Sequence, residues 1–372
     1  MTWTVHLVET LTGNLVSPLP VSSGSWTDAI NDAGDLKVKV PTPWLLKQPR
    51  WRWGAWSASL LACFQGEPLA LGPIVKDPQG GRDFTELEAG DLWSLLDQRV
   101  TTDRDYPESE ADGGKALAES TLSLNEGSLG TIGRRIVERA QLRPSGWFPI
   151  SYGSPEELGS NRERNFEGFN LGNNSAGKRL RELTEVINGP DISFRPRWVE
   201  RGNRVEWVMF HGTEGMPEIA QDHTYTVDLT APSARAVAPK VSSEFVPYAR
   251  VYASGDGQDK GTLIRITDEP VAEHMPLLET VLADSQTSNP DLLTSRGRGL
   301  LQQGRTVQLS VSVDDPLMPL HTWWAGDEVT VIWPHGWPQL DGGTYRMRIL
   351  KRSGDFSGRR VNVEFQPEQV LA

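Results

Sequence analysis

The chain has 372 residues, a formal net charge of −12, one cysteine and 14 tryptophans. This length gives a prior of about two to three domains, and the apolar content is sufficient for packed cores, so a disordered acidic tail is excluded. The acidic balance argues against a protein that wraps nucleic acid through phosphate contacts, and Cys63 alone excludes a disulfide framework or a cysteine-based zinc cluster. No apolar stretch approaches the roughly 20 residues of a membrane-spanning helix, and MTWTVHLVET lacks a secretory pattern. We therefore expect a soluble, non-secreted protein of several domains.

Residues 1–100 are predicted to form an N-terminal β domain. Apolar residues alternate with polar ones over 3–7 and over 36–40, which is the period of a half-buried strand, and Pro41 ends the second run. The segment 57–64 is another candidate strand. Asp91 is placed to cap a short helix over 91–100, whose leucines share one face.

Residues 101–235 are predicted to form an α+β middle region. Apolar residues at helical spacing between 129 and 140 predict one helix, with arginines on its outer side. A second helix is predicted over 176–188, and the sequence Asn188-Gly189-Pro190 supplies its C-terminal stop. Strands are expected at ISFRPRWV, RVEWVMFH and TYTVDLT.

Residues 236–372 are predicted to form a C-terminal β domain. Strands of the middle region could pack with this domain. The glycine-rich SGDGQDKG favours a hairpin turn, and leucines predict a helix over 290–303. Clean alternation then predicts four strands at 307–313, 329–333, 345–349 and 361–365, separated by turn-rich connections. An antiparallel meander that closes as a barrel or packs as a sandwich is the expected outcome. The fold class is therefore mainly β with an α+β middle region.

Three patterns that could carry chemistry are better explained structurally. The segment from Gly172 to Arg179 matches a phosphate-binding loop at both glycines and the lysine, but places Arg179 where the metal-binding hydroxyl belongs. We interpret it as a helix N-terminus capped by Asn174 or Ser175. The acidic SGDGQDKG lacks the alternating ligands of a calcium loop, and the six histidines show no ligand spacing. The sequence therefore nominates no catalytic residue, no metal and no cofactor.

The tryptophans concentrate at the two β-rich ends, with six before residue 57 and four within 323–337. Within PRWRWGAW, a strand would place Trp51 and Trp53 on one face and Arg50 and Arg52 on the other. A sugar-binding platform and an assembly surface are both functional interpretations, and core packing is the structural one. Core packing is favoured for a single tryptophan, whereas alternating Arg and Trp cannot all be buried in one domain. We therefore predict an assembly interface formed by Arg50, Trp51, Arg52, Trp53, Trp56, Trp323, Trp324 and Trp337.

The order of several segments resembles minor tail proteins of long-tailed phages that infect actinobacteria, in the tail-hub-like (baseplate hub) branch. The matching segments are GSWTDAINDAGDLKVKVPTPWLL, NGPDISFRPRWV, VYASGDGQDKGTLIRI, AGDEVTVIW and DGGTYRMRILKRSGDFSGRRVNVEFQP. Each segment is only a strand–turn–strand pattern, so the specificity lies in their order and spacing over most of the chain. No catalytic residue carries over from this family.

The resemblance implies two tube-like antiparallel β-barrel or sandwich domains with smaller α+β domains, assembled as a homotrimer. Three such chains would imitate six-fold symmetry at the tail tube. The implied function is a structural hub ring at the virion tail tip, assembled in the host cytoplasm and forming the conduit for DNA ejection. The implied partners are the tail tube or distal tail protein, a tail fibre or spike, and the tape measure protein or DNA in the lumen. No sequence-specific nucleic-acid binding and no integral membrane segment are expected.

Three alternatives belong to other classes. A distal tail protein would form a six-fold ring instead of a three-fold one. A carbohydrate-binding, receptor-binding tail protein would use exposed tryptophan, and a cell-wall hydrolase would be an enzyme. Because no catalytic constellation is present in the sequence, we expect a protein that is not an enzyme.

Overall fold

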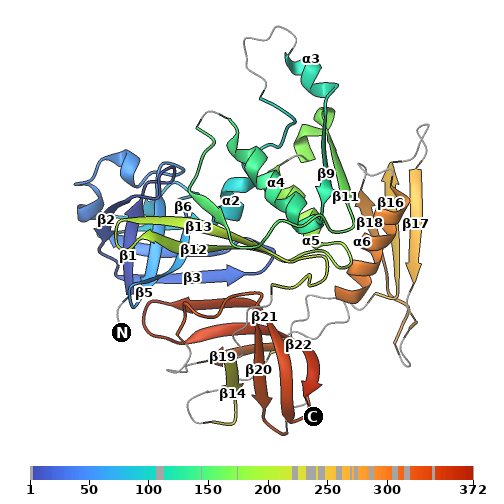
Figure 1. Ribbon diagram of the computed structural model, residues 1–372. Helices are drawn as coiled ribbons and strands as arrows, with labels where there is room; N and C mark the ends of the chain where they lie inside the picture. Colours follow the sequence, from blue (N-terminus) through green and yellow to red (C-terminus); the bar gives the residue numbers. More distant parts are fainter. Residues whose placement is uncertain are drawn as a thin grey trace.

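The computed structural model describes residues 3–105, 113–143, 145–173, 175–219, 225–231, 240–241, 248–256, 262–268, 270–271, 275–284, 289–303, 309–313, 319–336 and 340–371. The fold is mainly β, with several sheets and few helices, as the sequence predicts (Figure 1). No helix in these ranges is long and apolar enough to cross a membrane.

A four-stranded antiparallel sheet holds the N-terminal part of the chain. Its strands lie in the order β2-β1-β5-β6 and are β1 (Trp3–Val8), β2 (Leu15–Leu19), β5 (Ser59–Phe64) and β6 (Glu67–Pro73). Every residue of β5 is buried, because its two faces lie in different cores. Leu60, Ala62 and Phe64 belong to one core, whereas Leu61 and Cys63 belong to the other. The continuous apolar run SLLACF is typical of a strand covered on both faces.

A ten-stranded sheet joins the two ends of the chain. It contains β3 (Ser23–Ala29), β4 (Asp35–Pro41), β7 (Gln79–Gly80) and β8 (Phe84–Gly90) from the N-terminal part, and β14 (Tyr225–Asp228), β15 (Lys240–Val241), β19 (Leu309–Val313), β20 (Glu328–Trp333), β21 (Gly343–Asp355) and β22 (Val361–Leu371) from later segments. The junction is the antiparallel pairing of β21 with β3, in which Arg352 lies opposite Asp28. The four predicted C-terminal strands are present, and β20, β21 and β22 pair consecutively as a meander. The fourth strand, β19, pairs with β22 instead of β20, and β14 of the middle region adds to the sheet through β20.

The middle region packs helices on the far side of the N-terminal sheet. It consists of α2 (Leu92–Leu96), α3 (Gly113–Ala118), α4 (Leu129–Gln141), α5 (Ala176–Thr184), the 3-10 helix η2 (Gly168–Asn173), and strands β9 (Thr121–Gly127), β10 (Ile150–Tyr152), β11 (Arg162–Glu167), β12 (Ile192–Glu200) and β13 (Arg204–His211). Both α2 and α5 are shorter than the sequence predicts. Helix α5 ends at Thr184, before the predicted stop, and Asn188 adopts the left-handed backbone conformation.

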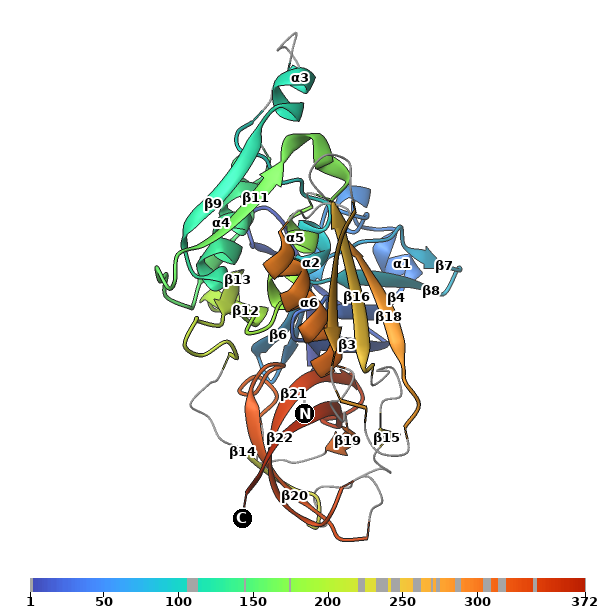
Figure 2. The ribbon, with the colours of Figure 1, turned by 90° about the vertical axis from the view of Figure 1, so that its right-hand side faces the viewer.

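A separate three-stranded sheet is formed by β16 (Arg250–Asp256), β17 (Thr262–Asp268) and β18 (Glu279–Asp284), with β16 in the centre. The pairing of β16 with β17 confirms the predicted hairpin, whose turn lies outside the described residues. Helix α6 (Pro290–Gln303) covers one face of this sheet, and its bounds match the prediction (Figure 2). A Cβ atom at Gly297 would lie 2.5 Å from Thr267 Oγ1, so glycine allows the close approach.

Hydrogen bonding therefore joins the first and last of the three predicted segments, 1–100 and 236–372. The division of the chain at residues 100 and 235 stays a prediction based on composition. Two cores lie on either side of the N-terminal sheet: one between that sheet and the ten-stranded sheet, the other between it and α2, α4 and α5.

Candidate functional site

The Arg–Trp segment is a turn of 3-10 helix instead of a strand. Residues Arg50–Arg52 form η1, shortly after the short helix α1 (Thr42–Leu45), so the predicted alternation of Trp and Arg on two strand faces is wrong. Pro49 starts this turn, because its fixed φ suits a helical start and it lacks the N–H that a strand ladder needs. A signal for this outcome was present in the sequence as Pro49, which directly precedes the turn.

The 3-10 turn separates the aromatic residues by burial. Trp53 is buried beneath the Arg50 guanidinium, 4.1 Å from the ring centroid, whereas Trp51 and Trp56 are 53% and 44% exposed. The Arg52 guanidinium stacks 5.2 Å from the Trp51 ring, and Arg50 pairs with the exposed Asp77 at 3.3 Å. Within this segment, the side chains left for a partner are therefore those of Arg50, Trp51, Arg52 and Trp56.

Trp51 and Trp56 line a cavity of about 490 Å³ that the sequence does not predict. Four separate segments enclose it: the turn between β1 and β2, the segment 51–57, the C-terminal end of α2, and the segment 145–148 before β10. Trp147, which is 55% exposed, lies on the same cavity. Local sequence pattern does not identify Trp147, because nothing near it marks it as different from a core tryptophan.

The polar groups of the cavity come from the same segments. Glu9 lies on its wall, where its carboxylate accepts a hydrogen bond from Thr12 Oγ1 at 2.7 Å. The Arg99 guanidinium donates to the backbone oxygen of Ala140 at 2.9 and 3.2 Å, and burial, followed by the charge of Arg143, lowers the pKa of Arg99. A Cβ atom on Gly146 would lie 2.3 Å from Arg99 Nη2, so glycine makes room for this guanidinium. The cavity therefore combines aromatic rings with one anionic and one cationic group.

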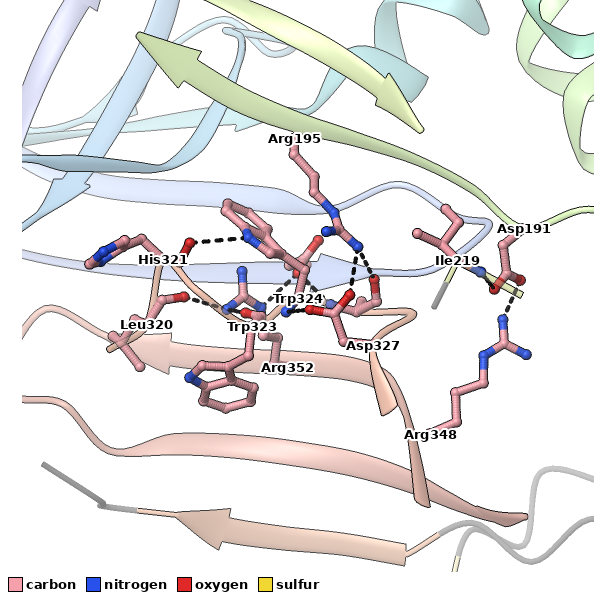
Figure 3. Close-up of polar contacts among 12 residues, drawn as sticks. Asp191, Arg195, Ile219, Leu320, His321, Trp323, Trp324, Asp327, Arg348 and Arg352 are labelled. Carbon is pink, nitrogen blue, oxygen red and sulfur yellow. Dashed lines mark hydrogen bonds and ion pairs between the residues drawn. The ribbon is translucent and has the colours of Figure 1, made fainter. Parts of the chain in front are cut away.

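The second predicted tryptophan cluster lies inside the chain. Trp323 and Trp324 are buried, and their rings pack against the guanidinium of Arg352, with its carbon 5.4 and 4.3 Å from their centroids (Figure 3). Burial of these rings within one copy leaves them no area for a neighbouring subunit, so their role in this copy is core packing. Trp337 lies outside the described residues.

Arg352 is the centre of a buried polar junction between β21, β3 and the segment 319–327. Its guanidinium pairs with Asp28 at 2.7 Å and donates to the backbone oxygens of Leu320, at 2.6 Å, and Trp323 (Figure 3). Burial lowers the pKa of Arg352, an effect that Asp28 opposes. The junction fixes the C-terminal strands against the N-terminal ones.

A second buried pair, Arg195 of β12 and Asp327, lies beside this junction at 3.0 Å. The backbone N–H of Trp324 donates to Asp327 at 2.7 Å. Burial raises the pKa of Asp327, and the nearby Arg195 opposes that rise. Arg348 also pairs with Asp191, which accepts from Ile219 N at 3.1 Å (Figure 3). These contacts hold β12 of the middle region against the ten-stranded sheet, so they are structural.

The phosphate-loop-like segment is a capped helix start. Ser175 caps α5 by accepting from Lys178 N at 3.3 Å, and Ala176 N donates to Arg99 O at 2.7 Å, so the first amides of the helix are already bonded. Asn174, the other predicted cap, lies outside the described residues. Arg179 is buried and pairs with Glu182 at 2.7 Å. Among the residues that the structure describes, no three His, Cys, Asp or Glu side chains gather as a metal site.

Comparison with known proteins gives no match to a family model and no match among curated protein sequences. Solved structures do match over the whole chain. A tail protein from Neisseria meningitidis MC58 is 12% identical, with a TM-score of 0.53 and coverage of 100% of this chain and 98% of that one. The 43 kDa tail protein of prophage MuSo2 from Shewanella oneidensis is 12% identical, with a TM-score of 0.56 and coverage of 97% and 98%.

A third structure connects this fold to secretion machinery. A component of the E. coli type VI secretion system, which exhibits structural similarity to the T4 bacteriophage tail proteins gp27 and gp5, is 10% identical. Its TM-score is 0.50, with coverage of 99% of this chain and 77% of that one. The chain therefore has the fold of phage tail proteins, in the form that resembles the tail hub.

Proposed function

We propose that this chain is a structural protein of a phage tail tip, where three copies form the hub ring between the tail tube and the host-contacting fibres or spike. The observation that carries the proposal is the extent of the likeness, which covers 97–100% of this chain and 98% of each of two tail proteins. A likeness limited to one β domain would be expected of many unrelated proteins, because one fold serves many functions.

An uncovered apolar sheet face supports self-association. On the face of β16–β18 opposite α6, Ile264, Ile266 and Val281 are all exposed, and Tyr252 lies between Ile266 and Val281 in the register of the three strands. Helix α6 is itself packed against the body of the chain, since Ser295 accepts from Ile187 N at 3.2 Å and Arg296 lies 3.7 Å from Glu182. The apolar face therefore points away from the body (Figure 1), as an assembly surface would.

The net charge supports a role as a DNA conduit. A lumen of like charge lets DNA slide, which is the converse of phosphate binding by clustered lysine and arginine, and the chain carries a formal charge of −12. The proposed mechanism is mechanical: the ring closes, seals the tube and passes DNA at ejection. The proposed neighbours are the tail tube or distal tail protein, a fibre or spike, and the tape measure protein or DNA in the lumen.

We also propose where the protein is located and which kind of phage it comes from. We place the protein in the virion tail tip of a long-tailed phage that infects an actinobacterium, after assembly in the host cytoplasm. The resemblance of the ordered sequence segments supports the host range. No catalytic role is proposed, and zymography on host cell walls tests that part, because a clear lysis band would contradict it.

The mass of the purified chain in solution tests the proposal. The mass of a trimer is expected. The mass of a hexamer would favour a distal tail protein, and a monomer at all concentrations would contradict the proposed hub ring. The double substitution Ile264→Asp with Ile266→Asp should reduce the trimer to monomers, because it places charge on the apolar sheet face. Leu158→Asp, which alters a still more exposed leucine elsewhere, is the control and should leave the mass unchanged. Circular dichroism checks that both variants are folded.

A further inference from the structure

Among the tryptophans that the structure describes, the strongly exposed ones are Trp51, Trp56 and Trp147, and all three line the same cavity. They come from two parts of the chain about 90 residues apart, so their convergence is a property of the fold and not of one sequence motif. The cavity of about 490 Å³ lies in the range of about 300–1,000 Å³ that is usual for small-ligand sites.

The backbone at the cavity is held in uncommon conformations. Trp56 has φ +60° and Ser145 has φ +60°, the left-handed region that bulky residues rarely adopt. The Trp56 N–H donates to Ile74 O at 2.6 Å, which fixes the residue at the start of the segment that leads into β5. Sparsely populated backbone conformations of this kind cluster at ligand sites. Because Trp56 itself has this conformation and a backbone hydrogen bond to Ile74, its position is fixed by the fold before anything binds.

The polar groups decide which ligand class fits. Glu9 supplies an acceptor, Arg99 supplies donors, and hydroxyl groups of Thr12 and Ser57 lie on the same cavity. An apolar side chain of a neighbouring protein would cover the indoles but would leave Glu9 and Arg99 dehydrated without a partner. A charged ligand of either sign would meet a like charge, since both signs are present. A ligand with flat C–H faces and many hydroxyl groups satisfies both the rings and the polar groups.

We propose that this cavity is a binding site for a neutral saccharide. One or two sugar rings stack their C–H faces on Trp51 and Trp147, and their hydroxyl groups donate to Glu9 and accept from Arg99. Trp56 forms part of the same aromatic wall. This assignment gives Trp51 and Trp56 a role other than the predicted assembly interface, and it does not depend on whether the chain forms a ring.

The experiment uses the full chain and a panel of neutral oligosaccharides built from hexose, pentose and N-acetylhexosamine units, followed by tryptophan fluorescence and calorimetry. Binding of at least one panel member with a Kd of about 0.1–1 mM is expected. Trp51→Ala and Trp147→Ala should each weaken it by about tenfold or more, and Glu9→Gln should weaken it less, because the amide keeps one acceptor. Phe169→Ala, which removes an exposed aromatic ring outside the cavity, is the matched control and should bind as the unmodified chain does.

Two results would overturn the proposal, and a third, from the control variant, would contradict its location. One is the absence of binding by every panel member at about 10 mM, with the chain shown to be folded. The other is a change in the mass of the assembled particle on Trp51→Ala or Trp147→Ala without a change in saccharide binding, which would assign the cavity to protein contact. Equal loss of binding in the Phe169→Ala control would also contradict a site at the cavity.

Discussion

The guanidinium of Arg352 is fully buried where β21 meets β3, and its acceptors come from two parts of the chain. Asp28 is 324 residues distant in sequence, and the backbone oxygens of Leu320 and Trp323 lie in the segment before β20. A buried charge is tolerated only when it is paired and hydrogen-bonded, and removal of one partner leaves the other dehydrated. The packing of β21 against β3 and against the segment before β20 therefore depends in part on this side chain.

Arg352→Met tests that dependence. The substitution leaves the Asp28 carboxylate without its counter-ion and two carbonyl groups without donors, so the free energy of unfolding should fall by about 3–5 kcal/mol. Arg346→Met is the matched control on the same strand, because Arg346 pairs with Glu328 at the surface and should cost about 0–1 kcal/mol. Urea denaturation followed by fluorescence measures both. An equal fall in the free energy of unfolding of the two variants would show that the buried Arg352 junction contributes no more to stability than the surface pair.

Asp91 makes stability depend on pH. It caps α2 by accepting from Trp93 N at 2.9 Å and also accepts from Gly34 N at 2.8 Å, and burial raises its pKa from 3.8 to about 7. The folded protein therefore holds this proton more tightly than the unfolded chain. Between about pH 4 and pH 7, the Asp91 contribution to the free energy of unfolding should fall as pH rises.

Comparison of Asp91→Asn with the unmodified chain isolates that contribution. Asn keeps the cap on Trp93 but cannot titrate, so the variant should lack the loss of stability with rising pH that Asp91 contributes between about pH 4 and pH 7. Asp83→Asn, which removes an exposed carboxylate elsewhere, is the control for the loss of one negative charge. Parallel curves for Asp91→Asn and the unmodified chain would show that Asp91 does not titrate in this range.

At the scale of elements, the start of α5 shows why a segment that matches a phosphate-binding loop serves helix packing instead. Gly177 lies where a Cβ atom would be 2.0 Å from Asp97 Oδ1, and Asp97 is held by Arg181 through two hydrogen bonds of 2.6 and 3.1 Å. The glycine that matches a phosphate-binding loop is thus needed for close packing of α5 against the end of α2. The helix start makes room for a neighbouring chain segment.

Gly177→Ala should destabilise the protein, although alanine is the better helix former. Helix propensity alone favours alanine by about 1 kcal/mol, but the displaced Asp97 loses its fit to Arg181, and overpacking costs about 1–3 kcal/mol. Gly114→Ala in α3 is the matched control, since nothing lies within 4 Å of its Cβ position, and it should be neutral or stabilising. Thermal unfolding compares the two. A stabilised Gly177→Ala variant would contradict the packing argument.

Helices and strands in which apolar residues recur at a regular spacing could be predicted from the sequence. Alternation gave β4 and the strands of the C-terminal meander, and leucine spacing together with Pro290 gave the bounds of α6. The segment at Arg50–Arg52 was predicted wrongly, because an alternating pattern of four residues, Arg50 to Trp53, is too short to distinguish a strand from a 3-10 turn. Pro49, directly before this segment, marks the start of the turn.

At the scale of the whole molecule, pairing between distant segments could not be predicted from local pattern. The β21–β3 junction and the contact of Trp3 Nε1 with Gly358 O at 2.9 Å bring together the two ends of the chain. The burial of Trp323 and Trp324 follows from that junction, and the cavity with Trp147 follows from the meeting of four segments. The clustering of tryptophans along the sequence suggested where an interaction surface lies. Which rings are exposed, however, is determined by the tertiary structure.

We propose above that three copies of the chain assemble as a hub ring. Three observations support this: the likeness to tail proteins over the whole chain, the exposed apolar sheet face of β16–β18, and the acidic net charge. A cryo-EM map of tails assembled with this chain would test the proposed hub ring. We expect three copies in a closed ring at the end of the tail tube, with the Ile264 and Ile266 face buried between neighbouring chains. A six-fold ring, or a tail tip that lacks the chain, would contradict it.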